Sequence, residues 1–198
     1  MSKLGKREAL VKRKTRETDI EVYLSLDGER DIQMEMDVPF FPHLLESMAF
    51  YAHWDLKIKA ITSEFIDDYH HIVEDTGIVL GEALEKCLGD KKGIERFATV
   101  FIPMDEALSM VAIDLSGRPY LLWEKPDLGE KVGSFEVGLV KEFLQALVNN
   151  AKITLHAKIW WGENGHHCLE ALFKALGKSL AQAANITSVY LPSTKGTL

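Results

Sequence analysis

The stretch HHIVE at residues 70–74 returns 96 positions later as HHCLE at residues 166–170. Each copy follows a stretch in which apolar and polar residues alternate, at residues 56–61 and 153–160, as they do in a half-buried strand. Each of these stretches in turn follows one with the apolar spacing of an amphipathic helix, at residues 40–51 and 135–148. The same order of elements around both motifs predicts that the chain is a tandem duplication.

Further alternating stretches extend the two halves. Residues 21–26 and 31–36 read as strands joined by a turn at Gly28, and residues 99–102 and 109–115 read as strands in the second half. Helical spacing continues over residues 76–88, up to Gly89, and over residues 168–184. We predict an α+β fold in which two packed halves each contribute a sheet plus two helices. The expected boundaries are a leader at 1–12, half-domains at 13–95 and 96–187, and a tail at 188–198.

Composition limits the classes of protein to consider. The chain has 198 residues, of which 46% are hydrophobic and 27% charged, as in ordinary globular domains. Its net charge of −7 argues against nucleic-acid binding. No apolar run approaches the roughly twenty residues of a membrane span, and the first residues lack the apolar core of a signal peptide. With only Cys87 and Cys168, a disulfide framework is not expected, and we predict a reducing cytoplasm as the location.

The two motifs have the composition of metal sites. On a helix, residues three or four apart are neighbours, so Glu74 can stand beside His70 or His71. Adjacent histidines point about 100° apart, so each pair is better suited to two ions than to one. Imidazole with carboxylate suits Mn, Fe, Zn or Ni, and the lack of nearby thiolates argues against structural zinc. Cys168 is interpreted as core packing.

His43 and Glu142 occupy equivalent places on the helix that precedes each motif. His43 could instead be a capping or surface residue, and Glu142 a solvated helix residue. His156 is interpreted as a packing or supporting histidine and His53 as a surface residue. The sequence therefore predicts four metal ligands from each half: His43, His70, His71 and Glu74 from the first, and Glu142, His166, His167 and Glu170 from the second.

At these residues the sequence resembles the imidazoleglycerol-phosphate dehydratase family, and the resemblance extends over residues 13–198. The matching stretches are RKTRET at 13–18, DD at 67–68 with HHIVED at 70–75, LGDKKGI at 88–94, PMDEAL at 103–108, DLSGRPY at 114–120, HHCLEALFKA at 166–175 and PSTKG at 192–196.

The resemblance implies dehydration of imidazole glycerol phosphate to imidazole acetol phosphate in L-histidine biosynthesis. It also implies two Mn²⁺ ions per active site and a shell of 24 subunits with sites between neighbours. The metal ligands it implies are the eight residues above, with Glu142 where many members have histidine. The implied substrate contacts are Glu17, His43, Arg96, Arg118, Lys174, Ser193, Thr194 and Lys195.

Physical chemistry assigns roles to these groups. The proton to be removed has no neighbouring carbonyl, so the reaction needs an electron sink, which a metal-bound imidazole can provide. Glu17 is the expected proton-transfer group, with Glu74 and Glu170 as further catalytic carboxylates. The arginine and lysine side chains are expected to hold the phosphate.

The sequence departs from the family at three places. Pro42 precedes His43 where the family has Asp or Asn, one extra residue precedes His70, and Tyr51 stands where many members place a substrate-site histidine. Two other functions would use the same metal ligands. A dinuclear phosphate-ester hydrolase would place a water between two close ions. A non-catalytic divalent-metal-binding protein would not need the basic residues.

Overall fold

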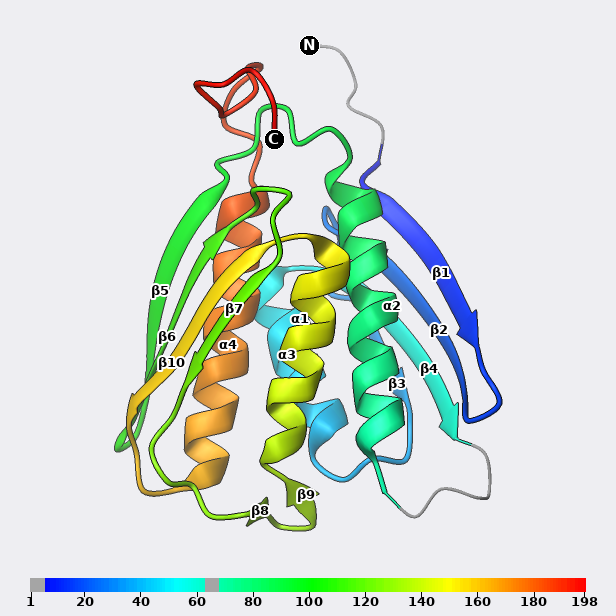
Figure 1. The fold of residues 1–198 in the computed structure, drawn as a ribbon, viewed down its shortest axis with the longest axis vertical. Coiled ribbons are helices and arrows are strands. Elements are labelled where there is room, and N and C mark those ends of the chain that lie inside the picture. The colour runs from blue at the N-terminus through cyan, green and yellow to red at the C-terminus, as the bar shows by residue number, and fades with distance from the viewer. Residues whose placement is uncertain (1–5, 63–67) are drawn as a thin grey trace.

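Two four-stranded sheets enclose a layer of helices (Figure 1). The structure is a computed structural model that describes residues 6–62 and 68–198. The first sheet contains β1 (Glu8–Lys14), β2 (Thr18–Ser25), β3 (Ile32–Glu35) and β4 (Asp55–Thr62), and the second contains β5 (Phe97–Met104), β6 (Ala107–Asp114), β7 (Tyr120–Glu124) and β10 (Thr154–Trp161). The helices are α1 (Phe41–Ala52), α2 (His70–Leu88), α3 (Gly138–Ala151) and α4 (Gly165–Ala184).

The strand order is the same in both sheets, which confirms the predicted duplication. It runs β1-β2-β4-β3 in one and β5-β6-β10-β7 in the other. In each sheet three strands are antiparallel, and the last strand runs parallel to its neighbour. The predicted strands correspond to six of these eight, since β1 and β7 were not expected.

β1 shows that the predicted leader at residues 1–12 is wrong from Glu8 onward. The strand pairs with β2 from Glu8 opposite Ser25 to Lys14 opposite Asp19. Lysines of β1 face acidic side chains of β2, with Lys12 bonded to Glu21 and Lys14 to Asp19. These cross-strand pairs let a basic stretch form an edge strand. Residues 1–5 of the predicted leader lie outside the described part of the chain.

The start of α3 also differs from the predicted helix at 135–148. Residues Phe135–Glu136 form the short strand β9, which pairs with β8 (Lys131–Val132), and α3 begins only at Gly138. Phe135 is fully buried and stacks on Phe41 with ring centroids 6.0 Å apart. The hairpin therefore inserts an aromatic anchor at the lower end of the helix layer before the helix starts (Figure 1).

The helices pair across the two halves. α2 lies against β1 and β2 of its own half but packs along α3 of the second half. α4 lies against β5 and β6 and packs along α1 of the first half. The predicted α+β class with packed halves is confirmed. Each half, however, pairs its helices with helices of the other half. This pairing brings residues from different halves into contact.

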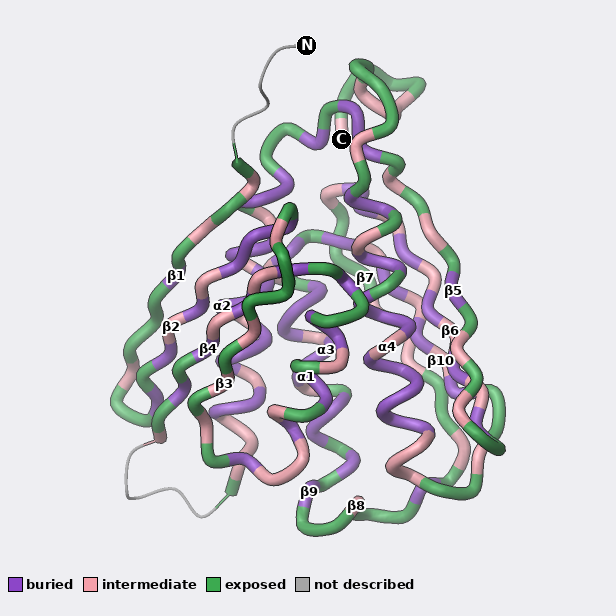
Figure 2. The backbone as a smooth tube through the Cα atoms, turned by 180° about the vertical axis from the view of Figure 1, so that it is seen from behind, coloured by how far each residue is buried: buried purple, intermediate pink, exposed green. Residues whose placement is uncertain are grey.

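The core lies between the sheets, where the helices are buried on their inner faces (Figure 2). Phe143 lies at its centre, 5.2 Å from Phe41 and 5.6 Å from Phe173 between ring centroids. Cys168 is fully buried, which confirms its interpretation as core packing. Within the described part of the chain, no helix combines the length and apolar composition that crossing a membrane would need.

Glycines allow the paired helices to approach closely. A Cβ at Gly177 of α4 would lie 2.0 Å from the carbonyl oxygen of Met48 on α1. A Cβ at Gly77 of α2 would lie 2.7 Å from the carbonyl oxygen of Phe143 on α3. Real Cβ contacts are not this short, so any side chain at these positions would force the helices apart.

Gly177→Ala is therefore expected to destabilise the protein by about 1–3 kcal/mol, the usual cost of overpacking a tight interior. The free energy of unfolding in urea measures this effect. Gly138→Ala is the matched control, because nothing lies within 4 Å of a Cβ there. Equal stability of the two variants would show that α1 and α4 are not in close contact.

Candidate active site

His43, His166 and Glu170 converge where α1 meets the start of α4. Nε2 of His43 lies 3.2 Å from Oε2 of Glu170, and Nε2 of His166 lies 3.0 Å from the same oxygen. One ligand atom from each of the three residues lies within 4.8 Å of the other two. Glu170 is buried, whereas the two imidazoles are partly exposed, so the cluster opens to the surface.

The helix starts orient both imidazoles. Pro42 occupies the first turn of α1, where its missing N–H costs nothing. Phe40, just before it, has a φ of 64°, and its ring lies 5.8 Å from the ring of His43 and 4.7 Å from that of His166. At α4, the side chain of Asn164 caps the helix by accepting a hydrogen bond from the N–H of His166. Phe40 therefore packs beside both imidazoles.

Glu170 is held as a carboxylate. Burial opposes its ionisation, but hydrogen bonds from Lys174 and His43 outweigh burial and lower its pKa to about 2. Nζ of Lys174 lies 2.8 Å from Oε1, so Oε2 is left to face the two histidines. Lys174 also lies 5.7 Å above the ring of Tyr51. These groups line one shallow hollow together with Glu46, Ser47 and Phe50.

The adjacent histidines of each motif have differently oriented rings and different partners. The ring planes of His70 and His71 are 87° apart, and those of His166 and His167 are 90° apart. Nε2 of His70 lies 3.6 Å from Oε2 of Glu74, one turn along α2. In each motif, therefore, the first histidine faces the glutamate of its own motif and the second faces a carboxylate from a turn between two strands.

Glu17 lies beside the first motif, where the turn between β1 and β2 is attached to α2. Nδ1 of His71 lies 3.6 Å from Oε2 of Glu17. Thr15 stabilises the turn, since its Oγ1 accepts hydrogen bonds from the N–H groups of Glu17 and Thr18. The hydroxyl of Thr18 donates to the buried carboxylate of Asp75, which follows Glu74 on α2. The predicted proton-transfer group is thus next to a predicted ligand.

Glu106 is a residue of the site that sequence reasoning missed. Its Oε2 lies 2.8 Å from Nδ1 of His167, and its Oε1 accepts the backbone N–H of Asn164 at 2.8 Å. The hydrogen bond with His167 is the main cause that lowers the pKa of Glu106 to about 2, and it raises the pKa of His167. Its position could have signalled it, because the β5–β6 turn repeats the β1–β2 turn that carries Glu17.

The three residues that converge come from both halves. His43 of the first half joins His166 and Glu170 of the second half. The reason is the pairing of α1 with α4. Glu142 is half-buried on α3, which runs beside α2, and within the described residues no hydrogen bond or ion pair joins it to the first motif.

Most of the chain matches proteins of one known family. The family model described as imidazoleglycerol-phosphate dehydratase matches residues 36–180. The chain belongs to this family. An imidazoleglycerol-phosphate dehydratase of Moorella thermoacetica is 50% identical over 194 residues, which cover 97% of this chain and 98% of that protein. One of Methanosarcina mazei is 46% identical over 188 residues, covering 95% of this chain and 97% of that protein.

Solved structures of the family share the fold. The crystal structure of IGPD from Pyrococcus furiosus superposes with a TM-score of 0.82 at 37% identity, covering 94% of this chain and 99% of that one. The enzyme of Staphylococcus aureus gives a TM-score of 0.77 at 37% identity, covering 91% and 99%. The predicted family is thus confirmed, and with it a dehydratase, a hydro-lyase of histidine biosynthesis.

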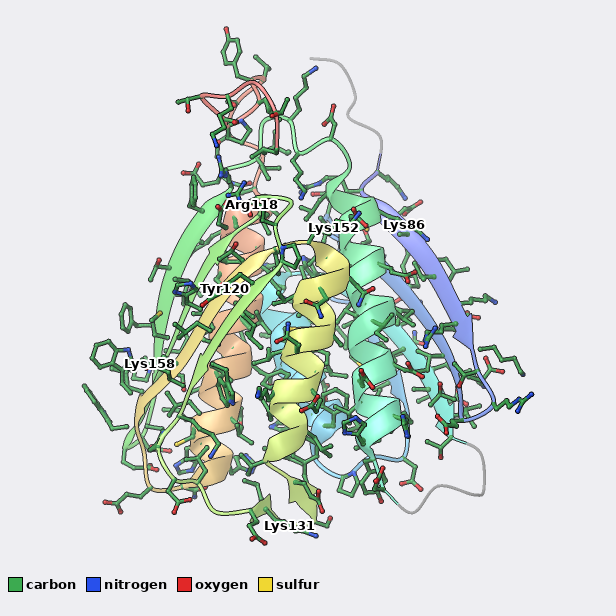
Figure 3. The ribbon with its side chains drawn as sticks, in the orientation of Figure 1. Lys86, Arg118, Tyr120, Lys131, Lys152 and Lys158 are labelled. Carbon is green, nitrogen blue, oxygen red and sulfur yellow. The ribbon has the colours of Figure 1, made fainter. Side chains whose placement is uncertain are left out.

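Of the basic residues implied by the family resemblance, Lys174 lies beside Glu170, whereas Arg96 and Arg118 lie far from the second motif in the same chain. The backbone N–H of Arg96 donates to the carbonyl of Ala183, at the last turn of α4. His166 is at the first turn, roughly 25 Å away at 1.5 Å per helical residue. Arg118 also lies at the upper end of the molecule, whereas α4 begins at the lower end (Figures 1 and 3). A single chain therefore does not bring Arg96 and Arg118 to the second motif.

Arg96 and the tail make contacts of their own at that end. The guanidinium of Arg96 forms two bonds with Asp114, at 2.7 and 3.2 Å, and donates to the carbonyl of Pro192 at 2.8 Å. Arg118 is mostly exposed and reaches the same carboxylate only at 3.4 Å. Ser193 bonds within the tail, to the carbonyl of Thr197. Arg96 therefore fastens the tail, and Arg118 is freer to meet a ligand.

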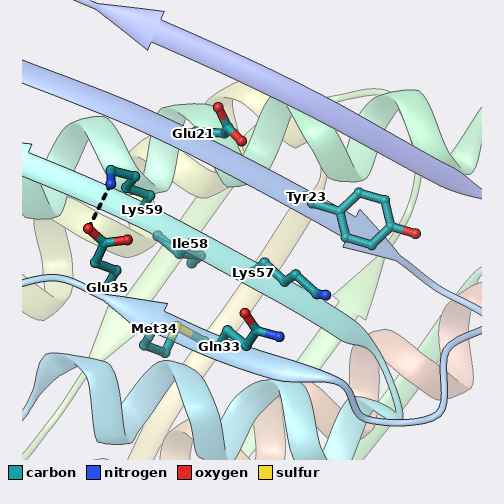
Figure 4. A pocket seen from close by; sticks show the side chains of 8 residues that line it. All are labelled: Glu21, Tyr23, Gln33, Met34, Glu35, Lys57, Ile58 and Lys59. Carbon is teal, nitrogen blue, oxygen red and sulfur yellow. Dashed lines mark hydrogen bonds and ion pairs between the residues drawn. The ribbon is translucent and has the colours of Figure 1, made fainter.

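A hollow on the outer face of the first sheet is a different feature (Figure 4). Its charged side chains are all paired, Lys59 with Glu35 at 2.7 Å, Lys57 with Asp31 at 2.6 Å and Glu21 with Lys12. None of the predicted site residues lines it. It is an ion-paired sheet surface.

Proposed function

We propose that this chain dehydrates imidazole glycerol phosphate to imidazole acetol phosphate at a centre that holds two Mn²⁺ ions. The observation that carries the proposal is the convergence of His43, His166 and Glu170 from two helices of different halves. Two imidazole nitrogens and an ionised carboxylate oxygen within 4.8 Å of one another can close around a divalent ion at bond lengths of about 2.0–2.2 Å.

The second ion is assigned to the equivalent pair of helices, α2 and α3, with His70, Glu74 and Glu142 as ligands. Oxygen donors at Glu74 and Glu142 suit Mn²⁺, which accepts carboxylates readily. His71 and His167 lie outside these two sets, because they face the carboxylates of Glu17 and Glu106. We assign them to the ions of neighbouring chains.

We infer a shared active site from the distance between the second motif and Arg118. A small phosphate ester cannot reach from His166 to Arg118 within one chain, since α4 separates the two ends. We propose that the substrate lies between the motif end of one chain and the Arg118 and tail end of another, within a closed symmetric shell of 24 subunits. The buried free thiols of Cys87 and Cys168 suit a cytoplasmic location.

We assign a separate role to each group of side chains. Held by these histidines and carboxylates, the metal would supply the electron sink that the reaction needs. Glu17 moves the proton, because its carboxylate is exposed beside the first motif and can reach a ligand there. Arg118, Lys174 and Lys195 hold the phosphate, with Ser193 and Thr194 as hydrogen-bond donors from the tail.

Incubation of the Mn²⁺-loaded protein with imidazole glycerol phosphate tests the proposal. We expect imidazole acetol phosphate to form with no release of inorganic phosphate. Release of phosphate would instead indicate a hydrolase. Tight Mn²⁺ binding without turnover would indicate a metal-binding protein, and either result would refute the dehydratase assignment.

A pair of variants tests the proton-transfer assignment. Glu17→Gln keeps the size of the side chain but removes its ionisable oxygen, so turnover should fall by roughly 10²-fold or more while both ions stay bound. Tyr51→Phe should cost much less, because a phenol is a poor base at neutral pH. Steady-state kinetics and metal analysis of both variants decide the matter. A nearly active Glu17→Gln with an inactive Tyr51→Phe would reverse the two roles.

A further inference from the structure

The two halves repeat a carboxylate at the turn between their first two strands. Glu17 follows β1 and Glu106 follows β5, and each lies beside the second histidine of the motif in its own half. We infer that Glu106 is a positioning residue, which holds His167 in the tautomer and orientation that leave Nε2 free to bind a metal ion. The inference rests on the metal centre of the proposed function.

The geometry of Glu106 leaves it little freedom. Oε1 accepts the backbone N–H groups of Asn164 and Glu163, at 2.8 and 3.3 Å, just before α4 begins. Oε2 is left for Nδ1 of His167 at 2.8 Å. Because a carboxylate can only accept, Nδ1 must carry the proton and Nε2 of the neutral ring must carry the lone pair. Nε2 faces the exposed carboxylate of Asp105 at 3.6 Å, on the open side of the turn.

Glu17 lacks this anchoring. Its carboxylate is half exposed, lies 3.6 Å from His71, and within the described residues accepts no hydrogen bond. The duplicated turn has thus taken on two roles. In the second half it fixes an imidazole, and in the first half it presents a carboxylate that is free to transfer protons. This difference explains why equivalent carboxylates need not have equivalent functions.

In Glu106→Gln the side-chain amide cannot accept hydrogen bonds both from the backbone N–H groups before α4 and from Nδ1 of His167. If the amide oxygen keeps the bond from Asn164, the amide N–H group faces Nδ1 of His167 and drives the proton to Nε2, which blocks metal binding there. If the amide turns over, its N–H group meets the backbone N–H groups of the helix start. Partners that orient metal-bound histidines are typically worth about 10–100-fold in metal affinity.

The experiment compares wild type, Glu106→Gln and the control Glu163→Gln, an exposed glutamate on the same loop. Mn²⁺ alone is titrated into each metal-free protein in a calorimeter, and ¹⁵N chemical shifts of labelled histidines report the tautomer without metal. We expect the affinity of Glu106→Gln for Mn²⁺ to fall by about 10–100-fold and its His167 to carry the Nε2 proton. The control should match wild type in both measurements.

The outcomes separate this inference from the proposed function. Failure of the wild type to bind Mn²⁺ would refute the metal centre itself. Normal binding by wild type together with equal affinity and an unchanged tautomer in Glu106→Gln would refute the positioning role. A lowered melting temperature with unchanged affinity would also refute it, since Glu106 would then serve only to fasten the loop.

Discussion

Replacement of Glu170 with glutamine is expected to remove about one Mn²⁺ ion per chain and to abolish most turnover. Both His43 and His166 direct Nε2 at Oε2 of this carboxylate, so glutamine removes the anionic centre of the cluster. The loss in metal affinity should reach on the order of 10³-fold, since even the outer partners of metal ligands are worth about 10–100-fold. Elemental analysis of the purified variant and its activity measure the effect.

Glu46→Gln is the matched control, because Glu46 lies on α1 and lines the same hollow. This control should keep its full metal content. Both variants should keep the wild-type fold, which circular dichroism measures. If the Glu170→Gln protein keeps wild-type metal content and activity, the cluster of His43, His166 and Glu170 takes no part in the reaction.

Mixing two inactive variants is expected to restore activity. Glu170→Gln disables the motif end of a chain, and Arg118→Gln disables the opposite end. If each active site combines the two ends from different chains, random mixing leaves about a quarter of the sites intact in a closed symmetric assembly. Dissociation, mixing in equal amounts and reassembly with Mn²⁺, followed by activity measurement, tests this expectation.

Each variant reassembled alone is the control and should stay inactive. The mixture gains activity only if the two ends belong to different chains in one active site. A mixture as inactive as its components would show that every active site is built within a single chain, contrary to the separation of Arg118 from the motifs.

Local pattern was sufficient to predict the elements that surround the motifs. Alternation in residues 56–61 and 153–160 predicted β4 and β10, because each strand buries one face against helices. β7 was missed because four of the five residues in YLLWE are apolar or aromatic and do not alternate, and their burial is only partial. β1 was missed because its basic side chains suggested a solvated leader, whereas their acidic partners on β2 are visible only in the folded pairing.

The candidate site was predictable in its residue types but not in its grouping. The HHxxE spacing places a histidine and a carboxylate on one face of a helix. Nε2 of His166 indeed lies 3.0 Å from Oε2 of Glu170. That His43 joins them depends on the close contact of α1 with α4 at Gly177, a long-range packing feature that periodicity does not encode. Glu106 was missed because one carboxylate in a turn looks like any other until the turn is seen beside His167.

Anomalous diffraction at the manganese edge from crystals of the Mn²⁺-loaded protein tests the central claim most directly. We predict a peak within about 2.0–2.3 Å of Nε2 of His43, Nε2 of His166 and a carboxylate oxygen of Glu170, uniting α1 of one half with α4 of the other. A peak that joins His43 to His70 and Glu74, with none at His166 and Glu170, would contradict the account.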